Sequence, residues 1–266
     1  MSAVLSWLQA LPWILGLALL AWMVCTARRN VGLVDIFWPL FLLVATLCYL
    51  RDASAHPPFP TAGPTPRALL VLSLVGFWSM RLAAHLALRN WNAPEDHRYQ
   101  AIRARNQPGF QWKSLYLVFA LQAVLAFIVS LPLQAAIASP APLNPVDALG
   151  AALAVTGILV EALADWQLAA FRNDASNRGK VLDRGLWRYS RHPNYFGEFC
   201  VWWGFFFMAL GTGAWWSIAS PLLMSLLLLR VSGVTLLEKD IGQRRPAYAA
   251  YVARTSAFFP RPGRSP

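Results

Sequence analysis

One stretch decides how this chain folds: Gly185-Leu186-Trp187-Arg188-Tyr189-Ser190-Arg191-His192-Pro193-Asn194-Tyr195-Phe196-Gly197-Glu198. It is polar and basic, and it leads directly into the apolar run Phe199 to Leu210. His192-Pro193 ends any helix that arrives from upstream. Asn194 is a favoured cap for a new helix, and Glu198 then falls one turn inside that helix. Because a helix start offers N–H groups and partial positive charge, the stretch predicts a phosphate site at a membrane face.

The composition of the 266-residue chain is that of a membrane protein. Hydrophobic residues make up 57% and charged residues 13%, whereas soluble domains carry about 25% charged residues. The mean hydropathy is +0.44. Lipid admits only helices or closed barrels, and the apolar runs are too long for barrel strands, so we expect an all-α polytopic fold. The three cysteines lack paired spacing, which predicts neither a disulfide framework nor a metal site.

Seven apolar segments predict seven transmembrane helices in a single membrane domain. They cover about residues 2–25, 31–50, 68–88, 114–138, 146–170, 195–210 and 215–237. The first is expected to be a retained helix rather than a signal peptide, since no basic region precedes it. We expect residues 1–145, with four spans, to form the substrate pocket, and residues 146–266, with three spans and a tail, to bind a cofactor.

The basic residues alternate between the two sides of the predicted membrane domain. Two, five, six and six of them follow the first, third, fifth and seventh spans, together 19 of the 23 Lys and Arg residues. By the positive-inside rule the N-terminus lies outside and the C-terminus lies in the cytoplasm. The rule also accounts for the net charge of +11 without any nucleic-acid partner.

Ionisable side chains inside spans are costly and indicate function. Those predicted here are Asp35, Arg81, His85, Glu161, Asp165, Glu198 and Arg230. Arg81 and His85 share one helix face, as do Glu161 and Asp165. All seven fall in the cytoplasmic half of their spans in the predicted orientation. We therefore expect a cavity that admits a water-soluble cofactor from the cytosol and an apolar substrate from the bilayer.

Structural explanations remain open for several of these residues. Arg81 or His85 could simply pair with Asp35, and Glu161 and Asp165 could be structural partners of Arg230. Trp187 and Tyr189 could belong to an interfacial aromatic belt, and Tyr248 and Tyr251 could mark an amphipathic surface helix.

The central stretch resembles the steroid 5α-reductase superfamily at Leu182-Asp183-Arg184-Gly185-Leu186-Trp187 and at Arg191-His192-Pro193-Asn194-Tyr195-Phe196-Gly197-Glu198. The tail resembles the bacterial branch at Leu237-Glu238-Lys239, at Arg245-Pro246-Ala247-Tyr248 and at Arg254-Thr255-Ser256-Ala257-Phe258-Phe259-Pro260. The resemblance implies a seven-helix enzyme of the bacterial inner membrane whose NADPH site faces the cytoplasm. It implies reduction of the double bond of an enone, such as a 3-oxo-Δ4 steroid, to the 5α-dihydro product.

The resemblance also implies which residues bind NADPH. The positions that match the family are Asp165, Arg172, Leu182, Trp187, Asn194, Tyr195, Glu198, Arg230 and Glu238. Asn194 and Glu198 match positions near the nicotinamide and its ribose. Arg172, with help from Arg178, Lys180 or Arg184, is expected to bind the 2′-phosphate or the pyrophosphate. We add five neighbouring candidates to the cofactor site: Glu161, Arg184, Tyr189, His192 and Tyr248.

The N-terminal half departs from the animal enzymes, in which a Glu on span two and a Tyr on span three hold the steroid carbonyl. Here span two offers Asp35, and span three offers Arg81 and His85. Asp35 could donate a hydrogen bond to the carbonyl only if protonated, a form that burial in lipid favours. His85 or Tyr99 could serve instead.

Two other functions remain open. The pattern Arg-His-Pro-x-Tyr-x-Gly is similar to that of integral-membrane methyltransferases that use S-adenosylmethionine, including the isoprenylcysteine type, although Glu238-Lys239-Asp240 replaces their paired glutamates. The protein could also bind a sterol or lipid without catalysing a reaction, but that function does not account for the buried acids. We expect a lipophilic enone and membrane lipid as partners, with no obligate protein partner.

Overall fold

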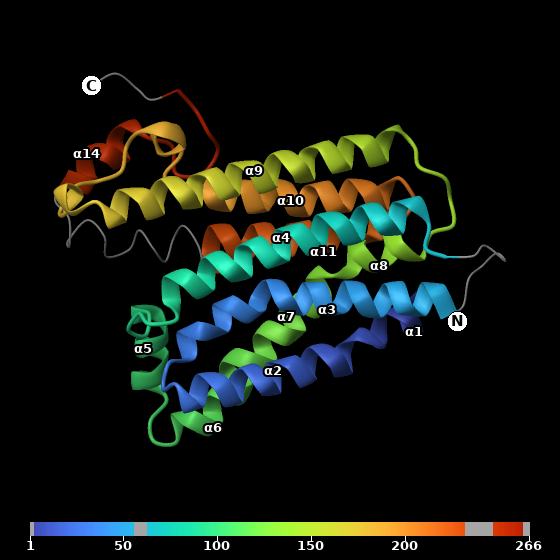
Figure 1. Cartoon of the computed structure of the whole chain (residues 1–266), viewed down its shortest axis with the longest axis horizontal. Coiled ribbons are helices and arrows are strands. Elements are labelled where there is room, and N and C mark those ends of the chain that lie inside the picture. The colour runs from blue at the N-terminus through green and yellow to red at the C-terminus, as the bar shows by residue number, and fades with distance from the viewer. Residues whose placement is uncertain (1–2, 56–62, 232–246, 263–266) are drawn as a thin grey trace. The chain divides into compact units, whose positions relative to one another are not determined.

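The computed structural model describes residues 3–55, 63–231 and 247–262, and every regular element within them is a helix (Figure 1). This confirms the all-α prediction for the described residues. The chain divides into two compact units. Unit 1 comprises Met1–Asp147 and Met208–Ser217, and unit 2 comprises Ala148–Phe207 and Ile218–Pro266.

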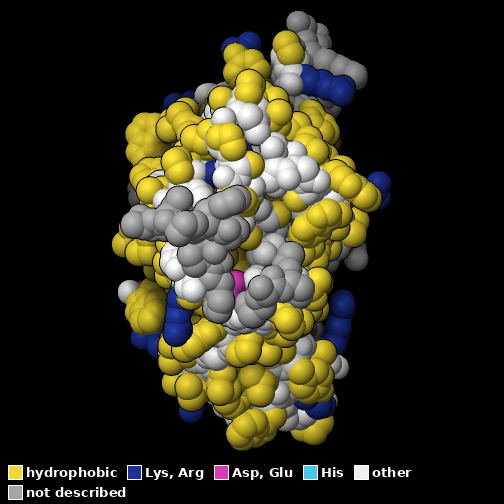
Figure 2. All heavy atoms as spheres, turned by 90° about the vertical axis from the view of Figure 1, so that its right-hand side faces the viewer, with side chains coloured by type: hydrophobic (Ala, Val, Ile, Leu, Met, Phe, Trp, Pro, Cys, Tyr) yellow, Lys and Arg dark blue, Asp and Glu magenta, His cyan; other side chains and the backbone are white. Residues whose placement is uncertain are grey.

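Five helical segments are long and apolar enough to cross a membrane, as expected of an integral membrane protein. They are Val4–Ala27, Val31–Ala55, Pro66–Asn90, Phe110–Val129 and Pro145–Asn173, which correspond to the first five predicted spans. The sixth predicted span is helix α10 (Pro193–Leu210), which is not among the five and has polar residues in its first turns. The seventh is helical from Trp215 to Arg230, and its remainder lies outside the described residues. Hydrophobic side chains predominate on the face that Figure 2 shows.

Unit 1 is built around helix α3. Its helices are α1 (Ala3–Leu8), α2 (Ala10–Ala27), α3 (Val34–Ala55), α4 (Pro66–Asn90), α5 (His97–Arg105), α6 (Phe110–Ser114), α7 (Leu121–Val129) and α8 (Leu131–Ala138). A 3-10 turn precedes α3 (Val31–Leu33), and a π-helical turn (Leu115–Ala120) joins α6 to α7. Helix α3 packs against α2, α4, α7 and α8. Phe41, Leu42 and Ala45 on α3 are fully buried at these contacts.

The fourth predicted span, residues 114–138, is divided in the structure. Helix α7 ends at Val129 and α8 begins at Leu131, with Ser130 between them. Pro132 in the first turn of α8 has no N–H to continue the α7 hydrogen-bond ladder. The Ser130 hydroxyl donates to the Phe127 carbonyl and pairs with the Tyr49 hydroxyl at 2.6 Å.

A buried ion pair holds one end of unit 1. Arg67 and Asp147 are each 1% exposed. The Arg67 Nε and Nη2 atoms donate to the two carboxylate oxygens of Asp147, each at 2.7 Å. The remaining donors of Arg67 reach the carbonyls of Ala141 and Pro142. Arg67 is one of the few basic residues that do not follow the alternation between the two predicted sides of the membrane. Its buried pairing with Asp147 gives it a structural role instead.

Unit 2 contains most of α9 (Pro145–Asn173), with α10, α11 (Ala219–Leu226) and α14 (Ala247–Arg254). Glycines bring the backbones of α9 and α10 together. A Cβ at Gly157 would lie 2.5 Å from the Gly197 carbonyl oxygen, and one at Gly204 would lie 2.6 Å from the Gly150 carbonyl oxygen. Small residues allow such close approach between membrane helices, and Figure 1 shows α9 and α10 running alongside each other.

Candidate functional site

Three buried carboxylates gather on α9 and at the start of α10 in unit 2. Glu161, Asp165 and Glu198 are 3%, 5% and 9% exposed. The Asn194 Nδ2 atom donates to Asp165 Oδ1 at 3.2 Å. A Cβ at Gly197 would lie 2.6 Å from the Glu161 backbone nitrogen, so the first turns of α10 lie directly against this part of α9. These acids, predicted to act together, do lie on contacting turns of two helices.

Helix α10 begins at Pro193, and the prediction that Asn194 caps it is wrong. Proline suits the first helical position because its φ is already helical and its missing N–H would have had no partner there. Asn194 therefore lies inside the first turn, where its side-chain amide donates a hydrogen bond to Asp165. Arg191, His192 and Pro193 are buried, so the exposed basic side chains upstream are better placed for a phosphate than this helix start.

Helix α9 anchors the basic stretch that precedes α10. The Trp187 indole N–H donates to the Ala164 carbonyl at 3.1 Å, and the Leu186 N–H donates to Gln167 Oε1 at 3.0 Å. Gly185 has a φ of +61°, and a Cβ there would lie 2.6 Å from the Gln167 side chain. Trp187 is 9% exposed, so its assignment to an interfacial aromatic belt is wrong.

The tail anchors the same stretch from the other side. The Arg191 guanidinium donates to the Thr255 and Val252 carbonyls at 2.6 and 3.2 Å, close to the end of α14. A cation suits this position because a helix C-terminus carries partial negative charge. Ser190 donates to the Phe258 carbonyl at 2.7 Å. Arg191 therefore has a structural role that the sequence motif did not reveal.

The other predicted cofactor residues differ in exposure. Leu182 and His192 are buried, and Tyr195 is half-buried with its ring stacked on His192 at a centroid distance of 5.6 Å. Tyr248 is buried and packs edge-on against Tyr251, so both tyrosines lie on the buried face of α14. The exposed members are Arg172, Arg184, Tyr189 and Arg230.

Two predictions concern the last apolar segment and the residues after it. No ion pair joins Arg230 to another described residue, so the structure does not support Arg230 as the partner of Glu161 and Asp165. Glu238 lies outside the described residues. Among the residues that the structure does describe, no group of three His, Cys, Asp or Glu side chains could hold a metal ion.

A second polar cluster surrounds Asp35 in unit 1. The Tyr99 hydroxyl donates to Asp35 Oδ1 at 2.6 Å, and Arg98 Nη2 donates to Asp35 Oδ2 at 3.2 Å. Gln122 Nε2 donates in turn to the Tyr99 hydroxyl at 3.1 Å. Asp35 is thus a hydrogen-bond acceptor here, whereas Tyr99 carries the donor hydrogen.

Helix α5 positions this cluster. Asp96 caps the helix, because its Oδ1 accepts the Arg98 N–H at 2.9 Å. None of the seven helical segments predicted from the sequence includes α5 (His97–Arg105). Arg98, rather than Arg81 or His85, is the cation bonded to Asp35, so the pairing predicted as an alternative is wrong. Arg81 and His85 are half-buried on α4, which packs along α3.

Charge and burial shift the ionisation of α5 side chains. Burial, together with the negative charge of Asp35 and the hydrogen bond to it, raises the pKa of Tyr99 well above its ordinary value. Burial by itself would raise the pKa of Asp96, but the hydrogen bonds and positive charge of Arg98 lower that pKa below its ordinary value. Tyr99 therefore keeps its phenolic proton at neutral pH.

Comparison with known proteins places the chain in a family. A model of the family described as "Protein of unknown function (DUF1295)" matches residues 21–255. An uncharacterized protein of Schizosaccharomyces pombe is 23% identical over 291 residues, which cover 94% of this chain and 80% of that protein. No solved structure matches the chain. Since the family match includes both polar clusters and most of the chain, the protein belongs to the DUF1295 family.

Proposed function

We propose that the protein is an NADPH-dependent reductase of the C=C bond of a lipophilic enone, such as a 3-oxo-Δ4 steroid, in the bacterial inner membrane. The observation that carries the proposal is the hydrogen bond from Tyr99 to Asp35, with Gln122 bonded to the same phenol. The family is associated with steroid 5α-reductase-like membrane proteins, which also supports it.

The residues of unit 2 fit the two chemical parts of NADPH. Its phosphates suit the exposed basic side chains of Arg172, Arg178, Lys180 and Arg184. Its nicotinamide riboside has hydroxyl and carboxamide groups, which suit the buried carboxylates and the Asn194 amide. When bound, NADPH supplies the hydride. The tail and α9 hold in place the stretch 185–192, which connects Arg184 to the start of α10.

The cluster in unit 1 suits the substrate carbonyl. Negative charge develops on the carbonyl oxygen as the β-carbon accepts a hydride, and a fixed donor stabilises that charge. Tyr99 keeps a hydrogen to donate because its pKa is raised. In our proposal the Tyr99 O–H turns from Asp35 to the substrate oxygen, while Arg98 remains the partner of Asp35. Tyr99 thus takes the donor role, and Asp35 positions it.

Cofactor binding to the purified full-length protein is the first test. We expect NADPH to raise the melting temperature, because a ligand that binds only the folded state stabilises it. Asn194→Ala should weaken this shift. A shift with S-adenosylmethionine alone would replace the proposal with the methyltransferase, and no shift with either cofactor would favour a sterol- or lipid-binding protein.

Turnover is the second test. Tyr99→Phe should lower testosterone- or progesterone-dependent oxidation of NADPH by about 100-fold or more and leave the NADPH-induced melting shift unchanged. Tyr116→Phe is the matched control, because Tyr116 is 60% exposed and should retain full activity. Full turnover by Tyr99→Phe would remove Tyr99 from the chemistry.

A further inference from the structure

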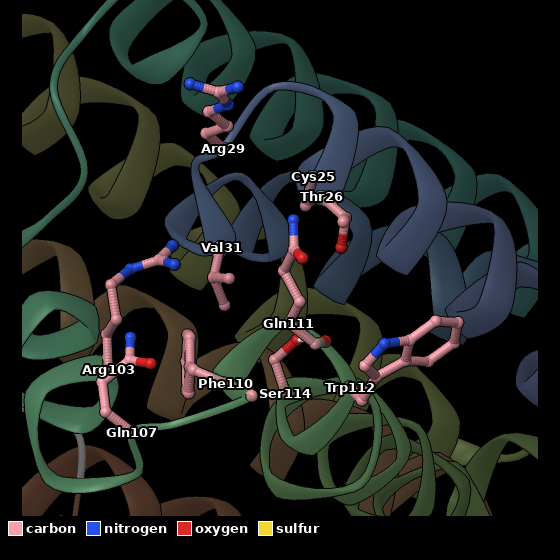
Figure 3. A pocket seen from close by; sticks show the side chains of 11 residues that line it. Cys25, Thr26, Arg29, Val31, Arg103, Gln107, Phe110, Gln111, Trp112 and Ser114 are labelled. Carbon is pink, nitrogen blue, oxygen red and sulfur yellow. Dashed lines mark hydrogen bonds between the residues drawn. The ribbon is translucent and has the colours of Figure 1, made fainter.

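Unit 1 contains a pocket of about 440 Å³ that the proposed reaction does not use (Figure 3). Its wall comes from the end of α2, the end of α5, and the segment Gly109–Ser114. Arg29 and Arg103 line the pocket, and none of its lining residues is acidic. Glu95 balances the charge of Arg103, so Arg29 gives the pocket wall its net positive charge. The pocket has the size of a small-molecule site.

Arg29 occupies a backbone conformation that normally belongs to glycine. Its φ is 53°. The Arg29 and Asn30 N–H groups donate to the Thr26 and Cys25 carbonyls, each at 3.0 Å, so Arg29 is the left-handed residue that terminates α2. A left-handed conformation is unfavourable for a residue with a Cβ. The arginine thus sits where glycine would be more stable, which points to a use for its side chain.

Polar groups that line the pocket retain donor capacity. The Thr26 hydroxyl oxygen is buried and has no hydrogen-bond partner among the described residues. Arg103 uses Nε and Nη2 on Glu95, at 2.9 and 2.7 Å, and its Nη1 makes no hydrogen bond to a described residue. Figure 3 shows the Arg103 guanidinium extending toward Val31 and the Gln111 side chain extending toward the end of α2.

Tryptophans adjoin the pocket on the side of α6. Trp112 lines it and is 70% exposed, and its ring lies 5.2 Å from that of Trp22 on α2. The Trp22 indole N–H donates to the Gln111 carbonyl at 2.9 Å, which ties α2 to α6. Tryptophan is enriched at the level of lipid headgroups, and basic pockets at that level bind phosphate headgroups.

We propose that this pocket binds a phosphate group, carried either by an anionic lipid headgroup or by a free phosphate ester. The Nη1 of Arg103 supplies one charged donor, and Arg29, whose guanidinium extends away from Arg103 in Figure 3, supplies the second by turning toward the ligand. Guanidinium groups match the geometry of phosphate oxygens. This proposal does not depend on the reductase activity.

The test titrates full-length protein in neutral detergent with phosphatidylglycerol, phosphatidylcholine or glycerol 3-phosphate, and follows the melting temperature. Arg29→Gln should weaken anion binding by about tenfold. Arg105→Gln is the matched control, because it removes an equal charge from an exposed residue of α5 that does not line the pocket. Arg29→Gly should raise the melting temperature of the ligand-free protein by about 2–4 °C while weakening anion binding as Arg29→Gln does.

The outcomes distinguish a lipid headgroup from a free phosphate ester as the ligand, and both from non-specific attraction to the surface. Binding of phosphatidylglycerol but not of glycerol 3-phosphate, sensitive to Arg29→Gln alone, assigns a lipid headgroup. Equally sensitive binding of glycerol 3-phosphate assigns a free phosphate ester. Equal weakening by the Arg29→Gln and Arg105→Gln variants would mean non-specific surface attraction and would overturn the proposal, as would the absence of binding by both anionic probes.

Discussion

Single polar side chains carry the chemistry proposed for this protein, and each is held by partners far away in the sequence. Tyr99 donates to Asp35 and accepts from Gln122, so three segments of unit 1 meet at one phenol. Buried polar groups are costly unless hydrogen-bonded. Tyr99 is 7% exposed, so its bonded phenol contributes to folding as well as to the proposed reaction.

The raised pKa of Tyr99 predicts a pH-dependent stability. In the unfolded chain tyrosine ionises near pH ~10, whereas folded Tyr99 holds its proton to higher pH. The stability from this phenol is complete below that pH and is lost as the pH rises toward the folded pKa. Thermal unfolding should show a higher melting temperature for the wild type than for Tyr99→Phe at neutral pH. The difference between the two melting temperatures should shrink above pH ~10. A constant difference from pH 7 to 11 would contradict this expectation.

At the scale of elements, the close packing of α9 against α10 depends on glycines, which have no side chain to separate the two backbones. The Gly157 and Gly197 positions face each other's backbone, and this contact brings Glu161 of α9 beside the first turns of α10. The packing of α9 against α10 therefore brings the buried acids together.

Replacing these glycines should separate the two helices. Gly157→Ala places a Cβ 2.5 Å from the Gly197 carbonyl oxygen, and overpacking of this kind costs about 1–3 kcal/mol. We expect a lower melting temperature in detergent and a smaller shift with NADPH. Gly76→Ala is the control, because nothing lies within 4 Å of its Cβ position on α4; equal melting temperatures for the two variants would refute the packing argument.

At the scale of the whole molecule, charge along the sequence predicts orientation in the membrane. The segment that contains α5 is rich in arginine, whereas the segment between α8 and α9 has no charged residue. The positive-inside rule therefore predicts that α5 lies in the cytoplasm and that the α8–α9 connection lies outside.

Labelling of single cysteines in intact cells tests this orientation. In a background without the three native cysteines, Ala104→Cys and Ala141→Cys would each offer one thiol at an exposed position. A membrane-impermeant thiol reagent should label position 141 in intact cells and position 104 only after the membrane is opened. The opposite pattern would reverse the predicted topology.

The sequence by itself determined the helical class, the approximate positions of the first five spans, though not the division of the fourth at Ser130, and the buried character of Glu161, Asp165 and Glu198. These features follow from local properties, because the thickness of the bilayer sets the length of an apolar run and few charges are tolerated inside it. Helix α5 escaped prediction because it is short and lacks an apolar run; only the cap at Asp96 signals its start.

Only the tertiary structure decided which polar groups are partners. Asp35 bonds to Arg98 and Tyr99 rather than to Arg81 or His85 on the helix packed beside it. Arg67 bonds to Asp147 across 80 positions of sequence. A charge in an apolar environment must find a partner within hydrogen-bond distance, and the packing of distant helices sets that distance, which no local pattern of residues records.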